Sequence, residues 1–119
     1  MNANRLVLVS LVVVAVLMGW RLYEQKHADT GQLAIRQNGD VVILAWTGEV
    51  ELPMHTLLVR AFEEWRTKSE HFLLQLNSAG GSVREGGDVV ELLQRIKRTH
   101  TLDTYVASRE ICMSMCVPI

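Results

Sequence analysis

Hydrophobic and polar positions divide the chain into an apolar N-terminal stretch, a polar connection and a region of alternating strand and helix patterns. Residues 6–20 carry no charge and contain only Ser10 and Gly19 as non-apolar members. The connection that follows is mainly polar. The pattern therefore predicts an apolar segment over residues 1–23, a linker over 24–32 and an α/β domain over 33–119.

The start of the domain has the pattern of a β-hairpin. Residues 33–37 and 40–46 flank Asn38-Gly39, a pair typical of a type I′ turn. Residues 41–46 are continuously apolar, which is typical of a strand covered on both faces of its sheet. Two further strands are predicted, over residues 72–76 and 104–107.

Two helices are predicted between these strands. Pro53 opens the first, whose apolar stripe consists of Met54, Leu57, Leu58, Ala61 and Trp65. The second covers residues 83–98, with Val89, Leu92, Leu93 and Ile96 on one face. The alternation of strands and helices predicts an α/β fold: a mainly parallel sheet of repeated β-α units with right-handed crossovers.

The apolar N-terminal segment is compatible with three structures. A membrane anchor needs roughly 20 apolar residues, which this segment reaches if residues 6–23 all take part and Arg21 snorkels to the interface. A cleaved secretory signal would have the same positive start and apolar centre. A buried core element is the third alternative, although the segment has no polar face. We expect contact with the inner membrane through residues 6–23 and a domain in the periplasm, or secretion to the periplasm.

Composition and charge narrow the choice of partners. A chain of 119 residues holds at most one such domain. The net charge is −1, from 12 basic and 13 acidic residues, so no electrostatic footprint for nucleic acid exists. We expect no nucleic-acid partner, no cofactor and no metal.

The residues 77–83, called the glycine turn below, join a predicted strand to a predicted helix. Backbone N–H groups in such a turn favour negative charge, whether on a phosphate, a carboxylate or an oxyanion. Gly80 and Gly81 allow close approach and positive φ there. Their spacing to the next glycines does not fit G-x-G-x-x-G, and no Gly-Lys-Ser/Thr follows, so dinucleotide and P-loop motifs are excluded. A purely structural tight turn remains the alternative.

A second candidate lies near the end of the chain, in Cys112-Met113-Ser114-Met115-Cys116. A serine that follows a strand can be presented for attack on a carbonyl group. The N–H group of the next residue, Met115, can then help to bind an oxyanion.

The two cysteines of this segment leave three alternatives open. Cys112 and Cys116 could form a disulfide in an oxidising compartment, because on a regular helix their Cα atoms would lie about 6 Å apart. Together with Met113 and Met115 they could instead bind Cu(I) through four sulfur atoms. They could also be two small buried residues.

Taken together, the glycine turn, the later Ser114-Met115 pair and the strand with its Thr47-Gly48-Glu49 end resemble the Clp protease proteolytic subunit of the crotonase superfamily. The resemblance covers residues 41–119 and implies that residues 33–119 are the N-terminal part of a domain of that fold. It also implies a serine peptidase with a peptide or protein substrate and the capacity to form homo-oligomers.

The resemblance assigns roles to particular residues. Ser114 corresponds to the nucleophile, and the N–H groups of Gly81 and Met115 correspond to the oxyanion hole. Gly80, Ser82 and Val83 would pair with the substrate backbone.

The general base of that family is missing from the expected place. Its histidine and aspartate follow the nucleophile, whereas all four histidines here precede Ser114: His27, His55, His71 and His100. We therefore expect an exported, Clp-like serine peptidase-family protein that is inactive as this chain. The alternatives are a non-catalytic peptide-binding or assembly protein of the same fold, and a thiol or Cu(I) protein built on Cys112 and Cys116.

Overall fold

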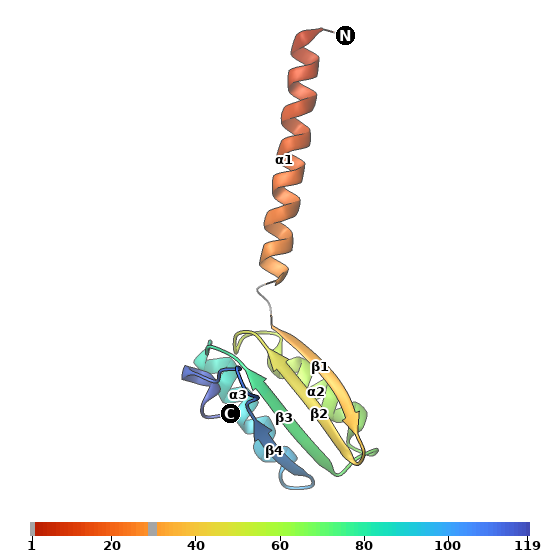
Figure 1. Cartoon of the computed structure of the whole chain (residues 1–119), viewed down its shortest axis with the longest axis vertical. Helices are drawn as coiled ribbons and strands as arrows, with labels where there is room; N and C mark the ends of the chain where they lie inside the picture. The colour runs from red at the N-terminus through yellow and green to blue at the C-terminus, as the bar shows by residue number, and fades with distance from the viewer. Residues whose placement is uncertain (1, 29–30) are drawn as a thin grey trace.

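A computed structural model describes residues 2–28 and 31–119. Its elements, in chain order, are α1 (Ala3–Ala28), β1 (Gln32–Asn38), β2 (Val41–Thr47), α2 (Met54–Trp65), β3 (His71–Asn77), α3 (Val83–Ile96), β4 (Thr101–Tyr105) and the 3₁₀ turn η1 (Ser114–Cys116) (Figure 1). The α1 helix extends into the predicted linker as far as Ala28, and residues 29 and 30 of that linker lie outside the described residues.

The strands form one mixed sheet in the order β1-β2-β3-β4. The β1 strand is antiparallel to β2, which confirms the hairpin, and β2, β3 and β4 are mutually parallel. The connecting turn is centred on Gly39-Asp40 and only Gly39 has positive φ, at 58°. The predicted type I′ geometry is therefore wrong, because that turn needs positive φ at both central residues.

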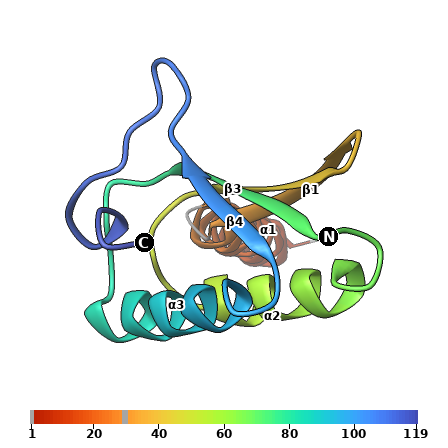
Figure 2. The ribbon, with the colours of Figure 1, turned by 90° about the horizontal axis from the view of Figure 1, so that it is seen from below.

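Both α2 and α3 pack on the same face of the sheet (Figure 2). Alternate strand residues point towards them and form the core, namely Val42, Leu44, Trp46, Phe72, Leu74, Leu76 and Leu102. The α2 helix contributes Met54, Leu58, Ala61 and Phe62, and α3 contributes Val89, Leu92, Leu93 and Ile96. The opposite face has no helix over it within the described residues, so the expectation of a strand covered on both faces is wrong for residues 41–46.

The last strand lies earlier than predicted, at Thr101–Tyr105 rather than at residues 104–107. Pairing with β3 begins where the N–H group of Thr101 donates to the carbonyl oxygen of Glu70, at 2.8 Å. Only Leu102 of this strand is buried. A single buried position gives no alternating pattern from which the strand could have been placed.

The α1 helix stands apart from the domain (Figure 1). Its side chains from Ala3 to Tyr23 are exposed, and this segment is long and apolar enough to cross a membrane. Exposure of so many valine and leucine side chains to water would be unfavourable. The helix therefore has the character of a signal sequence or a membrane anchor rather than of a core element.

One buried acidic side chain connects the two packed helices. Pro53, at the start of α2, provides no side-chain cap. Instead, Oε1 of Glu85 in α3 accepts a hydrogen bond from the backbone N–H of His55, at 2.7 Å. Glu85 is only 6% exposed. An acidic group at a helix N-terminus satisfies a free N–H group and interacts favourably with the helix dipole.

The contact between Glu85 and His55 predicts a specific loss of stability. We expect Glu85→Ala to lower the free energy of unfolding by about 2 kcal/mol, because a part-buried N–H group loses its charged acceptor. Glu85→Gln keeps an acceptor oxygen and should lose about half as much. Urea unfolding of the full chain in detergent measures both variants.

The matched control is Glu91→Ala, an exposed position of the same helix. It should change stability by no more than about 0.5 kcal/mol. Equal losses for Glu85→Ala and Glu91→Ala would show that Glu85 does not cap α2.

Candidate functional site

Three segments meet at the carboxyl ends of β2 and β3: residues 47–53, 77–83 and 111–117. We call them together the carboxyl edge. Short parallel bridges join Val50 to Gly81 and Ser78 to Cys112. The N–H of Val50 donates to the Gly80 oxygen at 2.7 Å, and the N–H of Ser78 donates to the Ile111 oxygen at 2.8 Å. Strand-like hydrogen bonding therefore continues past the sheet and fixes the three segments side by side.

The closest approach within the carboxyl edge is between Gly80 and Ser114. Gly80 has φ 116°, and a Cβ atom there would lie 2.7 Å from Cβ and 3.1 Å from Oγ of Ser114. Ser114 itself has φ 51°, which is uncommon for a residue with a side chain. The structure thus brings the glycine turn and Ser114 into direct contact, and glycine is required at position 80 on two independent grounds.

Ser78 stabilises this arrangement from inside the turn. Its side chain is buried, its hydroxyl accepts a hydrogen bond from the N–H of Gly80 at 3.2 Å, and it contacts the Gly80 oxygen at 3.3 Å. Ser78 was not among the residues predicted to form the site. A serine two residues before a glycine in a turn is the signal that could have identified it, because serine hydroxyls form such local bonds to the backbone.

The C-terminal segment is held in place by two contacts. Cys112 and Cys116 form a disulfide, with Cα atoms 5.2 Å apart, and Cys116 is completely buried. Met115 packs on Gly86 of α3, where a Cβ atom would lie 2.6 Å from the Met115 Cε. With both cysteines oxidised, the Cu(I) alternative lacks its thiolate ligands. The described residues also contain no cluster of three or more His, Cys, Asp or Glu side chains that could hold a metal.

A hollow of about 450 Å³ opens beside the glycine turn. Its lining is Glu51, Leu52, Ser82, Arg84, Glu85 and Asp88. Three acidic side chains and one arginine give this hollow a net negative character. Leu52, which lines the hollow, is 73% exposed. Val83, which lies in sequence between the lining residues Ser82 and Arg84, is 76% exposed.

The chemistry predicted for Ser114 needs a base, and the surroundings of the hydroxyl provide none. Within residues 2–28 and 31–119, the Ser114 hydroxyl makes no hydrogen bond to a histidine or a carboxyl group. His71 and His100 lie at the other end of the sheet, where Nε2 of His100 is 2.8 Å from the Arg66 oxygen. The N–H groups of Gly81 and Met115 donate no hydrogen bond in the same described part of the chain. Donors are therefore present without an activated nucleophile.

Comparison with known proteins identifies the fold. No protein-family model matches the chain, and no curated protein matches it. A solved structure does: the crystal structure of an anti-sigma factor antagonist from Mycobacterium paratuberculosis superposes with a TM-score of 0.52. The match covers 69% of this chain and 72% of that chain, at 12% sequence identity. The chain is therefore similar in fold to an anti-sigma factor antagonist (STAS) domain.

This likeness corrects the identification made from the sequence. The resemblance to the Clp protease proteolytic subunit was wrong, and with it the serine peptidase function and the crotonase-like fold. The α/β class is retained, as a four-stranded mixed sheet with two helices on one face. The catalytic roles of Ser114, Gly81 and Met115 were implied by that resemblance and stay predictions. All three residues lie in the carboxyl edge.

Glu85 was also missing from the sequence-based candidates. Ser82 and Glu85 have the spacing of a capping box, S-x-x-E, at the start of α3. Half of that motif is formed, since the N–H of Glu85 donates to Oγ of Ser82 at 3.3 Å. The N–H of Ser82 donates to the Val50 oxygen instead, at 2.8 Å. Glu85 is thereby free to cap α2.

Two glycine substitutions should have opposite effects on stability. We expect Gly80→Ala to lower the free energy of unfolding by about 2 kcal/mol or more, because positive φ and the contact with Ser114 both oppose a methyl group. Gly87, in α3, has open space around its Cα. Gly87→Ala should raise stability by about 0.5–1 kcal/mol through helix propensity.

Urea unfolding of the two variants measures these effects, and hydrogen exchange locates them. Exchange in Gly80→Ala should increase at residues 111–117 as well as in the glycine turn. An unaltered 111–117 segment in Gly80→Ala would contradict the packing of Ser114 on this glycine.

Proposed function

We propose that this protein is a membrane-tethered regulatory protein that acts by binding another protein at its carboxyl edge. The observation that carries this proposal is the likeness of its domain to an anti-sigma factor antagonist, a protein that by its description acts on another protein. The unactivated Ser114 hydroxyl favours binding over hydrolysis as the task of this surface.

The α1 helix supports a tether close to the carboxyl edge. Gln32 pairs with Thr47, so β1 begins at the same end of the sheet as the carboxyl edge. Three residues lie between Ala28 and Gln32. The four Cα–Cα steps from Ala28 to Gln32 span at most about 14 Å. If α1 crosses a membrane, the carboxyl edge lies near the membrane surface. A partner at that position would itself be bound to the membrane.

The disulfide supports a location outside the cytoplasm. Disulfides persist in oxidising compartments, the bacterial periplasm among them, and are rare where thiols are kept reduced. We therefore place α1 in the inner membrane and the domain in the periplasm. Cleavage of α1 would give the alternative, a secreted periplasmic domain.

The composition of the carboxyl edge indicates the chemistry of the partner. Exposed Val83 ends the glycine turn, and Leu52 and Met113 are exposed in the two other segments of the carboxyl edge. The neighbouring hollow is lined by Glu51 and Asp88. A complementary surface carries an apolar side chain next to a basic one. Apolar side chains provide the central contact area, and the acidic rim determines register and orientation.

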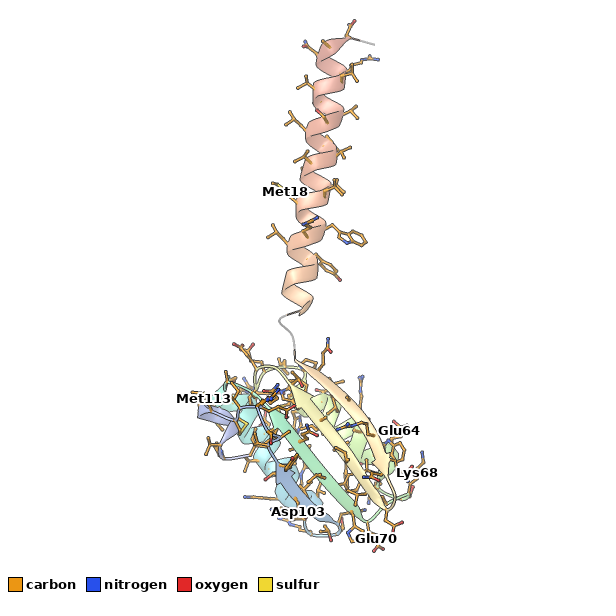
Figure 3. All side chains as sticks on the ribbon, in the orientation of Figure 1. Met18, Glu64, Lys68, Glu70, Asp103 and Met113 are labelled. Carbon is orange, nitrogen blue, oxygen red and sulfur yellow. A yellow bond between two sulfur atoms is a disulfide. The ribbon has the colours of Figure 1, made fainter. Side chains whose placement is uncertain are left out.

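Site-specific photo-crosslinking tests this binding surface. A photoreactive amino acid at Val83 or Met113, introduced into the full chain in its native membrane, should crosslink one membrane protein. The matched control is Glu70, an exposed residue at the opposite end of the domain (Figure 3). Val83→Asp should weaken binding of the purified partner by about tenfold or more, because a charge replaces a central apolar contact.

Two results would contradict the proposal. The first is equal crosslinking from Glu70 and Val83, which would show contact without specificity. The second is unchanged affinity of the purified partner for Val83→Asp.

A separate experiment tests the tether. We expect the full chain to remain in the membrane after alkaline carbonate extraction, and Val9→Arg combined with Val13→Arg to release it, because each charge near the centre of a spanning helix costs about 2.5–3.5 kcal/mol. Release of the unaltered chain by carbonate with its length preserved would exclude the anchor.

The disulfide is tested by thiol labelling. In intact cells, maleimide should label Cys112 and Cys116 only after a reductant is added.

A further inference from the structure

The open face of the sheet, opposite α2 and α3, has an apolar centre between two opposite charges. The paired residues Arg36, Ile43, Leu73 and Asp103 form one row across all four strands. Val41 and Ala45 lie on the same face, and both are half-buried, like Ile43 and Leu73. From the geometry of this face we infer that two copies of the chain dimerise through it, with Arg36 of each copy opposite Asp103 of the other.

The need for a cover comes from the strands themselves. Sheets of parallel strands are almost always covered on both faces. Here β2, β3 and β4 are parallel, and within residues 2–28 and 31–119 helices cover only one face. Two sheets pack face to face about 10 Å apart, with their strand directions within about 30° of each other. The open face of a second copy provides a cover of matching size and apolar character.

The charges at the two sides of the face select the symmetry of this dimer. Arg36 lies on β1 and donates to Oε1 of Gln75 at 3.1 Å, which places its side chain across the open face. Asp103 lies on β4, and Glu110, from the segment that rises on this side of the sheet, accepts from Gln75 at 3.2 Å (Figure 2). The β1 side is thus positive and the β4 side negative.

A two-fold axis that runs along the strands places β1 of one copy over β4 of the other. Arg36 then faces the second copy's Asp103 at two symmetric contacts. An axis across the strands would instead place Arg36 over Arg36 and Asp103 over Asp103. Like charges in an interface disfavour that arrangement. The charge pattern therefore favours the first axis.

If α1 crosses the membrane as proposed, its position selects the same axis independently. Rotation about an axis along the strands leaves both Gln32 residues at the same end of the dimer. Both α1 helices can then enter one membrane. Rotation about the other axis would send the two helices in opposite directions. Arg36 and Asp103 favour this axis whether or not α1 is a tether.

Charge reversal tests this dimer in the full chain in detergent, by analytical ultracentrifugation. We expect a wild-type dimer, and dimerisation weaker by about tenfold or more in Arg36→Asp and in Asp103→Arg, because like charges then meet at both contacts. An equimolar mixture of these two variants should dimerise again, since each mixed contact pairs opposite charges. The chain with both substitutions should also dimerise. Glu64→Arg, at an exposed position of α2, is the matched control and should have no effect (Figure 3).

Three outcomes would overturn the inference. A monomeric wild-type chain would mean that another partner covers the face. A dimer unaffected by both reversals would place its contact on α1 or on another surface. Loss of the dimer in the single variants without recovery in the mixture would show general damage rather than a broken contact. None of these outcomes bears on crosslinking at Val83, so the proposed function is tested separately.

Discussion

The close approach of backbones at the glycine turn is the constraint on which the arrangement of the carboxyl edge depends. Gly81 lies against Val50 on one side, and Gly80 lies against Ser114 on the other. Side chains at these two positions would separate the three segments that the short bridges join. With the turn fixed, Ser82 caps the N-terminus of α3, and Glu85 contacts α2. The positions of both helices on the sheet therefore follow from a turn of seven residues.

The same topology leaves the sheet unevenly covered. Right-handed crossovers between the parallel strands bring α2 and α3 to one face, and the antiparallel hairpin adds β1 without adding a helix. The open face retains an apolar centre because its strands have nearly continuous apolar sequences, as in Val41–Trp46. The hydrophobic effect therefore acts on both faces of the sheet, but the described chain satisfies only one of them.

The spacing of apolar residues predicted most helices and strands of the fold, because the apolar stripe of a helix and the turn of a hairpin depend on residues close together in sequence. The exception was β4, in which only Leu102 is buried. The wrong family came from the glycine turn and Ser114. Their residues encode a strand, a tight turn and a helix, and this local geometry occurs on unrelated folds. The contact between Glu85 and His55 could not be predicted, because it joins residues thirty positions apart through the packing of two helices.

The position of α1 relates the two surfaces to each other. The carboxyl edge and the start of β1 share one end of the sheet, whereas the open face runs along its length. A partner at the carboxyl edge and a second copy on the open face therefore approach from perpendicular directions and do not compete for the same residues. In a dimer with its axis along the strands, both carboxyl edges point the same way. Such a dimer presents two adjacent binding surfaces, so a partner that is itself dimeric would bind with the gain in avidity that comes from a high effective concentration.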